Sequence, residues 1–407
     1  MTETTVRISG YRWVVLLAFM AVIFVNQILW ITFASITGPA ARFYGVSDLA
    51  IAALALSFMV VYIVVSIPAS WIIDTYGLRV GVGSGAVLTG VFGLPRGLGG
   101  ESYTTVLLAQ IGVAVAQPFL LNAITTVGAR WFPLDERATA SGLGTLSMYA
   151  GQVTALALTP FLVLATSIPT MLMMYGVLAV AGSLVFLILA RERPPTPASA
   201  DGTGERALVF DGIKLALRQR DFQLTQLIFF IGLGVFNGVE TWIEDIVRPR
   251  GVSITQAGLV GALLVGAGVF GALVLPTLSD RSRRRVPYIV LALAASTLGL
   301  AGITFAQQYG WLLAGAALMG FFLLAAGPIG FQYGAEVTYP APEGTTNGLL
   351  LMIGQVSGIL FILAMDAFKV PATGSMTPSL LVLIGLMVVG ALLSTQLRES
   401  KMIREAP

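Results

Sequence analysis

The sequence predicts an all-α membrane protein of twelve transmembrane helices arranged in two pseudo-symmetric six-helix bundles. Its composition is too apolar for a water-soluble fold: 56% of the 407 residues are hydrophobic and 11% are charged, whereas soluble domains carry about a quarter charged residues. Apolar stretches of roughly twenty residues recur, each long enough to cross ~30 Å of hydrocarbon at 1.5 Å per residue. Because the bilayer core offers no water to the backbone, these stretches must be helices.

The apolar stretches fall into two groups of six, separated by one charged linker. We predict an N-terminal bundle over residues 1–190, a cytoplasmic linker with a short amphipathic helix over 191–221, and a C-terminal bundle over 222–407. The expected spans are 13–38, 49–73, 80–98, 102–127, 138–163, 169–190, 222–247, 254–279, 287–307, 310–334, 346–367 and 378–397.

The basic residues set the orientation. An even number of spans puts both termini on one face, and eighteen of the 23 Lys and Arg residues fall on that face. The positive-inside rule then predicts cytoplasmic termini, and we expect a multi-pass protein of the plasma membrane. The first span is too long for a signal peptide and lacks a cleavage site. Only five basic residues fall outside: Arg42, Arg96, Arg248, Arg250 and Lys369.

The linker combines a polar segment and a helical pattern. It opens with the helix-breaking run Arg191-Glu-Arg-Pro-Pro, which favours a solvated connection. From Ala207 to Arg218, apolar residues recur at helical spacing with basic residues between them. This pattern predicts a short amphipathic helix on the inner membrane surface. We expect the linker to tie the two halves together while letting them move.

Several classes of protein are excluded by what the sequence lacks. The chain contains no cysteine and no histidine, which removes disulfides, thiolate metal sites and the usual proton shuttle near neutral pH. It carries no catalytic constellation and no nucleotide motif, so we expect no enzyme activity, no cofactor and no metal. We attribute the basic pI to topology and expect no nucleic-acid partner. The expected partners are a small-molecule substrate, the lipid bilayer and at most a coupling proton or ion, with the chain as a monomer.

The two halves are sequence repeats at an offset of 206 residues. Asp74-Thr-Tyr-Gly-Leu-Arg follows the second predicted span, and Asp280-Arg-Ser-Arg-Arg-Arg follows the eighth. The same offset relates Thr139 to Thr345 and Gly142 to Gly348 at the starts of spans five and eleven. Parallel six-span halves are the layout of the major facilitator transporters, whose substrate site lies between the halves near the midplane.

The loop after span two resembles the signature loop of the major facilitator superfamily. It reads Asp74-x-x-Gly77-x-Arg79: an acid at a helix end, a glycine for a tight turn and a cation. We expect Asp74 to face Arg130 at the end of span four and to close the inner side in one conformation. The alternative is that these are ordinary topology residues. The family's leading glycine is replaced by Ser70.

The second copy of this loop departs further from the signature. Arg283 replaces the glycine after Asp280, so we expect this turn to be looser. Glu336 ends span ten near the same face, where gate pairing, with Arg130 or Arg137, is favoured over substrate contact.

Longer runs resemble the feline leukaemia virus subgroup C receptor family. That family comprises facilitators of choline and ethanolamine, for which haem has also been proposed. The resemblance extends over the whole chain and is most specific in spans one, two, ten and eleven. The runs that carry it are Asn26-Gln-Ile-Leu-Trp-Ile, Arg42-Phe-Tyr-Gly-Val-Ser, Gly330-Phe-Gln-Tyr-Gly-Ala-Glu-Val-Thr-Tyr-Pro and Glu343-Gly-Thr-Thr-Asn-Gly-Leu-Leu, continuing to Gln355-Val-Ser-Gly-Ile-Leu.

The resemblance implies a central pocket containing Asn26, Trp30, Gln152 and Gln355. The family's span-seven aromatic residue is not matched, because Asn237 stands there. From the residues alone, polar side chains within spans face a cavity or another helix, and residues four apart share a helix face. Helix-to-helix hydrogen bonding is the alternative for the amides, and an interfacial aromatic belt is the alternative for Trp30.

Span seven carries the strongest anomaly, a series of acids along one helix. A carboxylate at Glu240 that faced lipid would cost a few kcal/mol. It must therefore face water or a cation, or carry a proton. We expect Glu244 and Asp245 to lie in a solvated outer vestibule, paired with Arg248 and Arg250. For Glu240 the sequence leaves two alternatives, a place in the outer vestibule or a place in the substrate site.

These features predict a carrier that moves a small organic solute by alternating access. Trp30 offers a face that attracts cations, Glu240 offers a negative charge, and no Lys or Arg is expected in the middle of any span. We therefore favour an amine, a quaternary ammonium or a zwitterion. The alternatives are a proton-coupled multidrug or lipid exporter using Glu240, a haem or porphyrin transporter, and a non-transporting receptor or scaffold.

Overall fold

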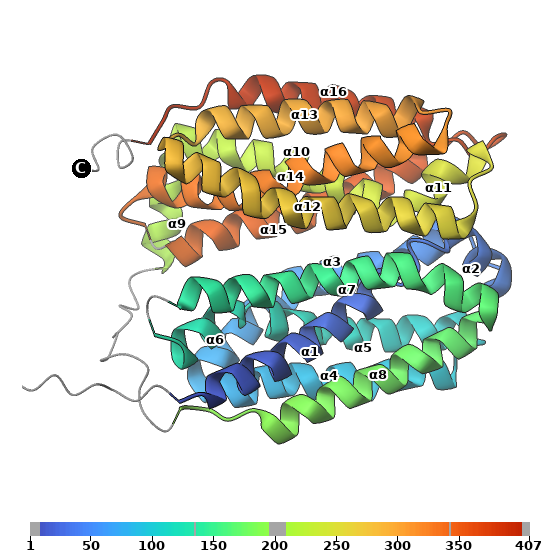
Figure 1. Ribbon diagram of the computed structural model, residues 1–407, viewed down its shortest axis with the longest axis horizontal. Coiled ribbons are helices and arrows are strands. Elements are labelled where there is room, and N and C mark those ends of the chain that lie inside the picture. Colours follow the sequence, from blue (N-terminus) through green and yellow to red (C-terminus); the bar gives the residue numbers. More distant parts are fainter. Residues whose placement is uncertain (1–8, 134–135, 195–208, 342, 401–407) are drawn as a thin grey trace, which may run out of the picture. The chain divides into compact units, whose positions relative to one another are not determined.

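The computed structural model describes residues 9–133, 136–194, 209–341 and 343–400, and within these ranges the secondary structure is helical with no strand. Twelve helices are long and apolar enough to cross a membrane, which confirms the predicted fold class. The chain divides into two compact units (Figure 1). Unit 1 comprises residues up to 33 and 39–204, and unit 2 comprises 34–38 and the chain from 205 onward.

Unit 1 is a bundle of six membrane-length helices, the fourth of which is divided. One core cluster joins α1 with α3, α4, α5, α6, α7 and α8 around Phe19, Trp131 and Phe186, each at most 1% exposed. The helices are α1 (Tyr11–Ile31), α2 (Thr37–Tyr44), α3 (Asp48–Tyr76), α4 (Leu78–Leu98), α5 (Tyr103–Leu121), α6 (Ile124–Trp131), α7 (Arg137–Ala165) and α8 (Ile168–Leu189).

Unit 2 repeats this plan and begins with one additional helix. The first helix, α9, covers most of the segment expected to be amphipathic, and its Ala216 packs with Phe222 and Leu350. The helices are α9 (Val209–Arg218), α10 (Arg220–Thr241), α11 (Ile243–Val247), the 3₁₀ helix η1 (Arg248–Arg250), α12 (Ile254–Ser282), α13 (Val286–Phe305), α14 (Tyr309–Thr338), α15 (Glu343–Ala367) and α16 (Thr377–Ser394).

The 206-residue repeat extends to individual backbone angles and hydrogen bonds. Gly45 and Gly251 both have positive φ, 66° and 73°, and each is followed two residues later by a serine that caps the next helix. The Tyr103 hydroxyl donates to the Ala50 carbonyl at 2.7 Å, and the Tyr309 hydroxyl donates to the Gln256 carbonyl at 3.2 Å. These pairs are related by the repeat offset, so the two units share one architecture.

Three expected spans are interrupted, although their apolar sequences run on without a break. The first helix stops at Ile31 rather than near residue 38, span four breaks at Asn122, and span seven breaks at Trp242. In span four the cause is visible in the sequence, because Pro118 removes a backbone donor near the helix end. At the first break the Thr32 hydroxyl donates to the Ile28 carbonyl at 2.5 Å, which satisfies an oxygen the helix leaves unpaired.

Close helix packing in unit 2 depends on glycine. A Cβ added to Gly271 of α12 would overlap the Phe321 carbonyl of α14, and one added to Gly320 of α14 would overlap the Leu264 carbonyl of α12. The glycine-rich run in α12 is therefore a packing face, as small residues in membrane helices commonly are.

Candidate functional site

In unit 1, four polar side chains form a buried chain of hydrogen bonds across three helices. Gln152 of α7 donates to Gln27 Oε1 at 3.0 Å, Gln27 donates to Asn26 Oδ1 at 3.4 Å, and Asn26 donates to Thr89 of α4 at 3.4 Å. All four are at most 3% exposed, and Gln152 Oε1 has no hydrogen-bond partner among the described residues. Asn26 thus contributes to helix packing, whereas the Oε1 atom of Gln152 is available to accept a hydrogen bond from a ligand.

Trp30 lies one helical turn beyond Asn26 on α1. Its indole N–H donates to the Ala55 carbonyl of α3 at 3.3 Å, and its ring centroid lies 6.5 Å from that of Phe58. Gln110 of α5 fixes the same region, because its amide donates to the Leu29 carbonyl at 3.1 Å. The indole is 9% exposed, so its orientation is set by α3 before any ligand binds.

In unit 2, Glu240 is the clearest candidate for a ligand-binding group. It lies near the end of α10 with 0% exposure, and neither carboxylate oxygen has a hydrogen-bond partner among the described residues. The neighbouring Thr241 hydroxyl is also buried and unpaired there. Asn237 on α10 and Gln355 on α15 are partly exposed. An unpaired buried carboxylate is costly, so a proton or a cationic ligand must compensate it.

The acids that follow Glu240 form a buried ion-pair cluster. Glu244 and Asp245 are 3% and 0% exposed, which corrects the expectation of a solvated vestibule. Arg248 pairs with both of them, as expected, and Lys369 pairs with Asp245 at 2.8 Å. The expected role of Arg250 is wrong: it donates instead to the Ile303, Thr304 and Ala306 carbonyls, because these end α13 without intrahelical partners.

At the end of unit 1 where α8 finishes, a glutamate organises the signature loop. Glu192 accepts backbone hydrogen bonds from Leu78 at 3.0 Å and Arg79 at 2.6 Å, and it forms an ion pair with Arg130. A carboxylate at a helix N-terminus is stabilised by the unpaired N–H groups there. Asp74 is exposed and makes no ion pair with a described residue. In this structure Glu192, rather than Asp74, is the partner of Arg130.

Gly77 is required at this loop for two reasons, and its substitution gives a first prediction. Its φ is 97°, and an added Cβ would overlap the Glu192 carboxylate. Its ψ is 173°, and this backbone region is essentially restricted to glycine and costs other residues about 1–3 kcal/mol, so we expect Gly77→Ala to lower the free energy of unfolding by at least that amount. Gly45→Ala is the control, because Gly45 has positive φ and open space around it. Thermal unfolding of both variants in detergent checks this, and equal losses would contradict a special role for Gly77.

The replacement of the signature glycine by Ser70 has a structural explanation. Asn122, at the break between α5 and α6, donates to Ser70 Oγ at 2.9 Å and Ser66 Oγ at 3.0 Å, and it accepts from the Tyr62 hydroxyl at 2.8 Å. Ser70 therefore supplies an acceptor for the amide that holds this break in place.

The corresponding end of unit 2 carries a second network with different charges. Glu399 accepts from the Arg285 and Val286 backbone N–H groups at 3.0 Å each. The buried Arg285 side chain pairs with Asp280 and, at 3.1 Å, with Glu336. Burial acts to lower the pKa of Arg285, but the hydrogen bond to Asp280 and the charge of Glu336 raise that pKa overall, so the guanidinium stays charged. Within unit 2 the partner of Glu336 is thus Arg285, and the pairing with Arg130 or Arg137 stays a prediction.

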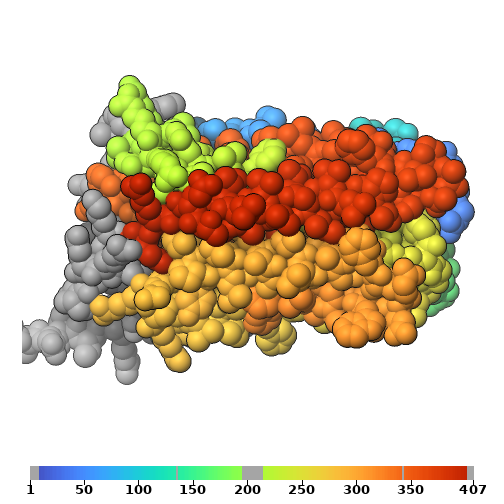
Figure 2. All heavy atoms as spheres, turned by 90° about the horizontal axis from the view of Figure 1, so that it is seen from above, coloured from blue at the N-terminus to red at the C-terminus, as the bar shows by residue number. Residues whose placement is uncertain are grey.

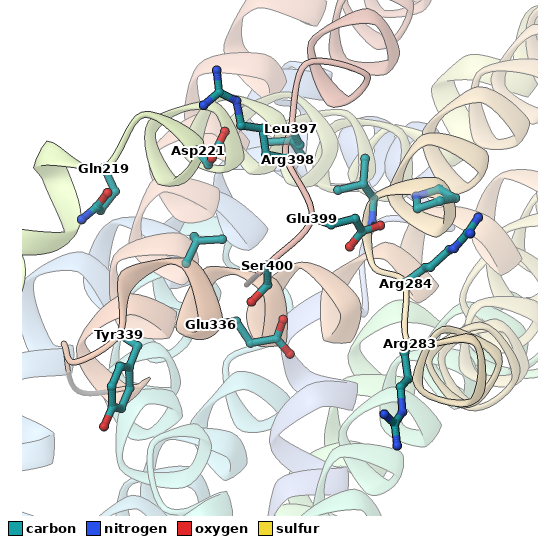
Figure 3. Close-up of a pocket in the computed structure, with 13 residues that line it drawn as sticks. Gln219, Asp221, Arg283, Arg284, Glu336, Tyr339, Leu397, Arg398, Glu399 and Ser400 are labelled. Carbon is teal, nitrogen blue, oxygen red and sulfur yellow. The ribbon is translucent and has the colours of Figure 1, made fainter. Parts of the chain in front are cut away.

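Arg283 makes the turn that was expected to be loose. Its φ of 51° and ψ of 41° are left-handed, and its N–H donates to the Asp280 carbonyl. Gly77, at the equivalent position of unit 1, also has positive φ but an extended ψ of 173°, so the two turns differ in conformation. Beside this turn lies a cavity of about 1150 Å³. Figure 3 shows Glu336 and Ser400 in its middle, with Arg283 and Arg284 on one side and Tyr339 on the other.

Arg96 lies at the end of the span predicted over 80–98, but its side chain is buried, which the sequence did not predict. It occupies the last turn of α4 with 0% exposure, and its guanidinium nitrogens have no hydrogen-bond partner in the described part of the chain. Its Cζ lies 5.7 Å from the Phe33 ring centroid, a cation–π contact. The described part of unit 1 thus holds one buried cation within a membrane helix. An absence of Lys and Arg from the spans therefore cannot support a cationic substrate, and the argument for its charge rests on Glu240.

Glu192 and Glu399, which accept backbone hydrogen bonds at the starts of α4 and α13, share a sequence pattern that the sequence analysis missed. The dipeptides Arg191-Glu192 and Arg398-Glu399 follow the last helix of each unit, 207 residues apart. Gln27 was missed although it is an amide inside a span next to Asn26. Among the described residues, no group of three or more Asp or Glu side chains is arranged to hold a metal ion.

Two six-helix units related by a parallel repeat, with buried polar groups inside the bundles, define a polytopic membrane transporter. Residues 15–362 match the Major Facilitator Superfamily. The chain belongs to that superfamily and, within it, to the family of solute carrier family 49 member A3 and the FLVCR transporters, as the likeness of its longer runs indicated.

Sequence relatives cover almost the whole chain. Solute carrier family 49 member A3 of Danio rerio is 30% identical over 385 residues, which cover 91% of this chain and 81% of the relative. The choline/ethanolamine transporter FLVCR1 of Felis catus is 30% identical over 418 residues, covering 96% and 74%.

Solved structures share the fold. A bacterial homologue of the human lysosomal transporter Spinster, in an inward-facing and unoccupied conformation, superposes with a TM-score of 0.79 at 18% identity, covering 98% of this chain and 99% of that one. The nucleoside transporter NupG gives 0.73 at 14% identity, covering 94% and 99%. The superfamily match and the sequence relatives, not the fold alone, make the chain a transporter rather than an enzyme.

Proposed function

We propose that this transporter carries a small organic cation or zwitterion that bears an amine or a quaternary ammonium group. The observation that carries the proposal is the fully buried Glu240, whose two carboxylate oxygens lack partners among the described residues. A bound ammonium would supply the missing charge. The relatives support the same class, since FLVCR1 and FLVCR2 are named as choline/ethanolamine transporters.

Polar and aromatic side chains of α1, α7, α10 and α15 complete the proposed site. Gln152 keeps a free acceptor oxygen, Gln355 and Asn237 are partly exposed, and Trp30 is held in a fixed orientation. We assign substrate contact to Asn26, Trp30, Gln152, Asn237, Glu240 and Gln355. Because Asn26 is already hydrogen-bonded to Thr89, its main effect is to position Gln27 and, through it, Gln152.

The charged networks at the linker ends of the two units are the proposed gates. We assign Asp74, Gly77, Arg79 and Arg130 to the first gate, and Asp280 and Glu336 to the second. Arg130 can exchange partners, because the Glu192 carboxylate with which it pairs also accepts from the N-terminal N–H groups of α4. With the basic residues concentrated at these ends, we infer cytoplasmic termini. The plasma-membrane location and the monomeric state stay predictions.

A ligand screen tests the substrate class. Purified protein is heated with choline, ethanolamine, other amines and zwitterions, organic anions, or haem, and the unfolding temperature is recorded. We expect stabilisation by choline, ethanolamine or a related amine and none by anions or haem. Stabilisation by anions alone would contradict the proposed charge of the substrate.

Two substitutions of Trp30, which should weaken ligand binding to different degrees, test the same site. A cation over an indole face gains about 0.5–2 kcal/mol, so Trp30→Ala should weaken cation binding by roughly 2- to 30-fold. Trp30→Phe is the matched control: it retains an aromatic face but loses the hydrogen bond to Ala55, and it should bind better than the alanine variant. Equilibrium binding of the ligand found in the screen measures both, and equal affinities would argue against a cation–π contact.

A proton-coupled exporter of drugs or lipids remains the second candidate, because a carboxylate buried like Glu240 can also hold a proton. The two functions differ in what drives flux. An exporter of this kind requires a pH gradient across proteoliposomes, whereas a facilitator of organic cations runs on the substrate gradient alone.

A further inference from the structure

The loop between α12 and α13 is strongly basic and borders a second, smaller cavity in unit 2. Residues 280–285 contain four arginines and one aspartate. Next to them lies a cavity of about 550 Å³, lined by Ser282, Arg284, Pro287, Tyr288 and Leu291. No acidic residue lines it, so the cavity presents one guanidinium, two hydroxyl groups and an apolar wall.

Arg284 is the cation available to a ligand in this cavity. Arg285, its neighbour, is committed to Asp280 and Glu336. Arg284 is exposed, and its guanidinium makes no ion pair or hydrogen bond within the described ranges. It also borders the larger cavity, but Glu399 there is occupied by two backbone N–H groups of the α13 N-terminus. An anion beside Arg284 would therefore meet little opposing charge.

The apolar side of the cavity continues along a face of α13. Leu291, Leu298 and Phe305 are 48%, 68% and 59% exposed, and their seven-residue spacing puts them on nearly one face of the helix. Figure 2 looks onto this part of unit 2, where α13 and α16 form the surface. Arg284 stands two residues before α13 begins, which is where a lipid headgroup would lie relative to a spanning helix.

We propose that this cavity binds an anionic phospholipid. The phosphate pairs with Arg284 and accepts a hydrogen bond from the Tyr288 hydroxyl, because the Ser282 hydroxyl already donates to the Ser279 carbonyl. An acyl chain follows Leu291 and Leu298 along α13. Free phosphate and a lipid headgroup share the same chemistry at Arg284. The apolar face of α13 assigns the site to the lipid, because inorganic phosphate would leave that face unused.

The test measures the thermal stability of the full-length protein as phosphatidylglycerol is titrated into phosphatidylcholine micelles. We expect saturable stabilisation whose half-saturating lipid concentration rises about tenfold in Arg284→Gln. Arg281→Gln is the matched control: it removes the same charge from an exposed position three residues earlier, in the last turn of α12, that does not line the cavity, and it should behave as wild type. Inorganic phosphate and glycerol phosphate are run in parallel and should not stabilise.

Two outcomes would overturn the proposal. If Arg281→Gln and Arg284→Gln weaken the lipid effect equally, the attraction is a general property of the basic loop and not of this cavity. If inorganic phosphate stabilises at the same concentrations as phosphatidylglycerol, the ligand is a free anion. Leu291→Ser adds a further check, because it should weaken the lipid effect while leaving the arginine in place.

Discussion

Glu240→Gln is expected to abolish high-affinity binding of organic cations. The substitution keeps the size of the side chain and removes the only charged group of the protein that we assign to substrate binding. Truncating one partner of a buried charge pair costs about 2–5 kcal/mol, which corresponds to a loss of affinity of about 30-fold or more. Equilibrium binding to purified protein measures the effect with the amine that stabilises the protein most.

The matched control for this variant is Glu101→Gln, which neutralises an exposed glutamate between α4 and α5. It should leave affinity unchanged. Without a ligand, Glu240→Gln should be at least as stable as wild type, because a neutral amide is easier to bury than an unpaired carboxylate. Unchanged cation affinity in Glu240→Gln would remove the basis of the proposed substrate charge.

The largest expected effect on stability lies at Arg285. Its side chain and that of Glu336 are 9% and 7% exposed, so Arg285→Met leaves Glu336 buried without its partner. Breaking one side of a buried pair costs about 3–5 kcal/mol, whereas replacing both sides is often nearly neutral. We therefore expect Arg285→Met to lower the free energy of unfolding strongly, and the double variant with Glu336→Gln to recover most of that loss.

Thermal or denaturant unfolding in detergent compares the two single variants with the double variant. Asp280→Asn provides the contrast, because the Asp280 side chain is 65% exposed and an exposed ion pair contributes little. If the double variant is as unstable as Arg285→Met, Arg285 acts through its packing and not through the charge of Glu336.

The number and order of the membrane helices could be predicted from sequence because hydrophobic length alone decides them. The repeat was also visible, since Asp74 and Asp280 lie at the same offset that relates Gly45 to Gly251. The helix breaks were harder to find. The segment around Thr32 is as apolar as the helix before it, and only Pro118 left a local signal.

The partners of the charged residues could not be predicted, because pairing depends on which helices pack together. Arg130 and Glu336 occupy equivalent positions 206 residues apart, yet they carry opposite charges and find different partners, Glu192 and Arg285. The burial of Glu240 is a similar case. Its place near the end of its span is compatible with a vestibule or a site, and its 0% exposure follows from tertiary packing that the sequence does not display.

The most direct test of the central claim is transport by the purified protein in proteoliposomes. Vesicles preloaded with unlabelled choline or ethanolamine should accumulate the labelled compound from outside by exchange, without a pH gradient, and organic anions should neither exchange nor compete. Glu240→Gln vesicles should show no exchange, and Glu101→Gln vesicles should match wild type. Exchange of an anion in place of the cation, or cation exchange that persists in Glu240→Gln, would contradict the account.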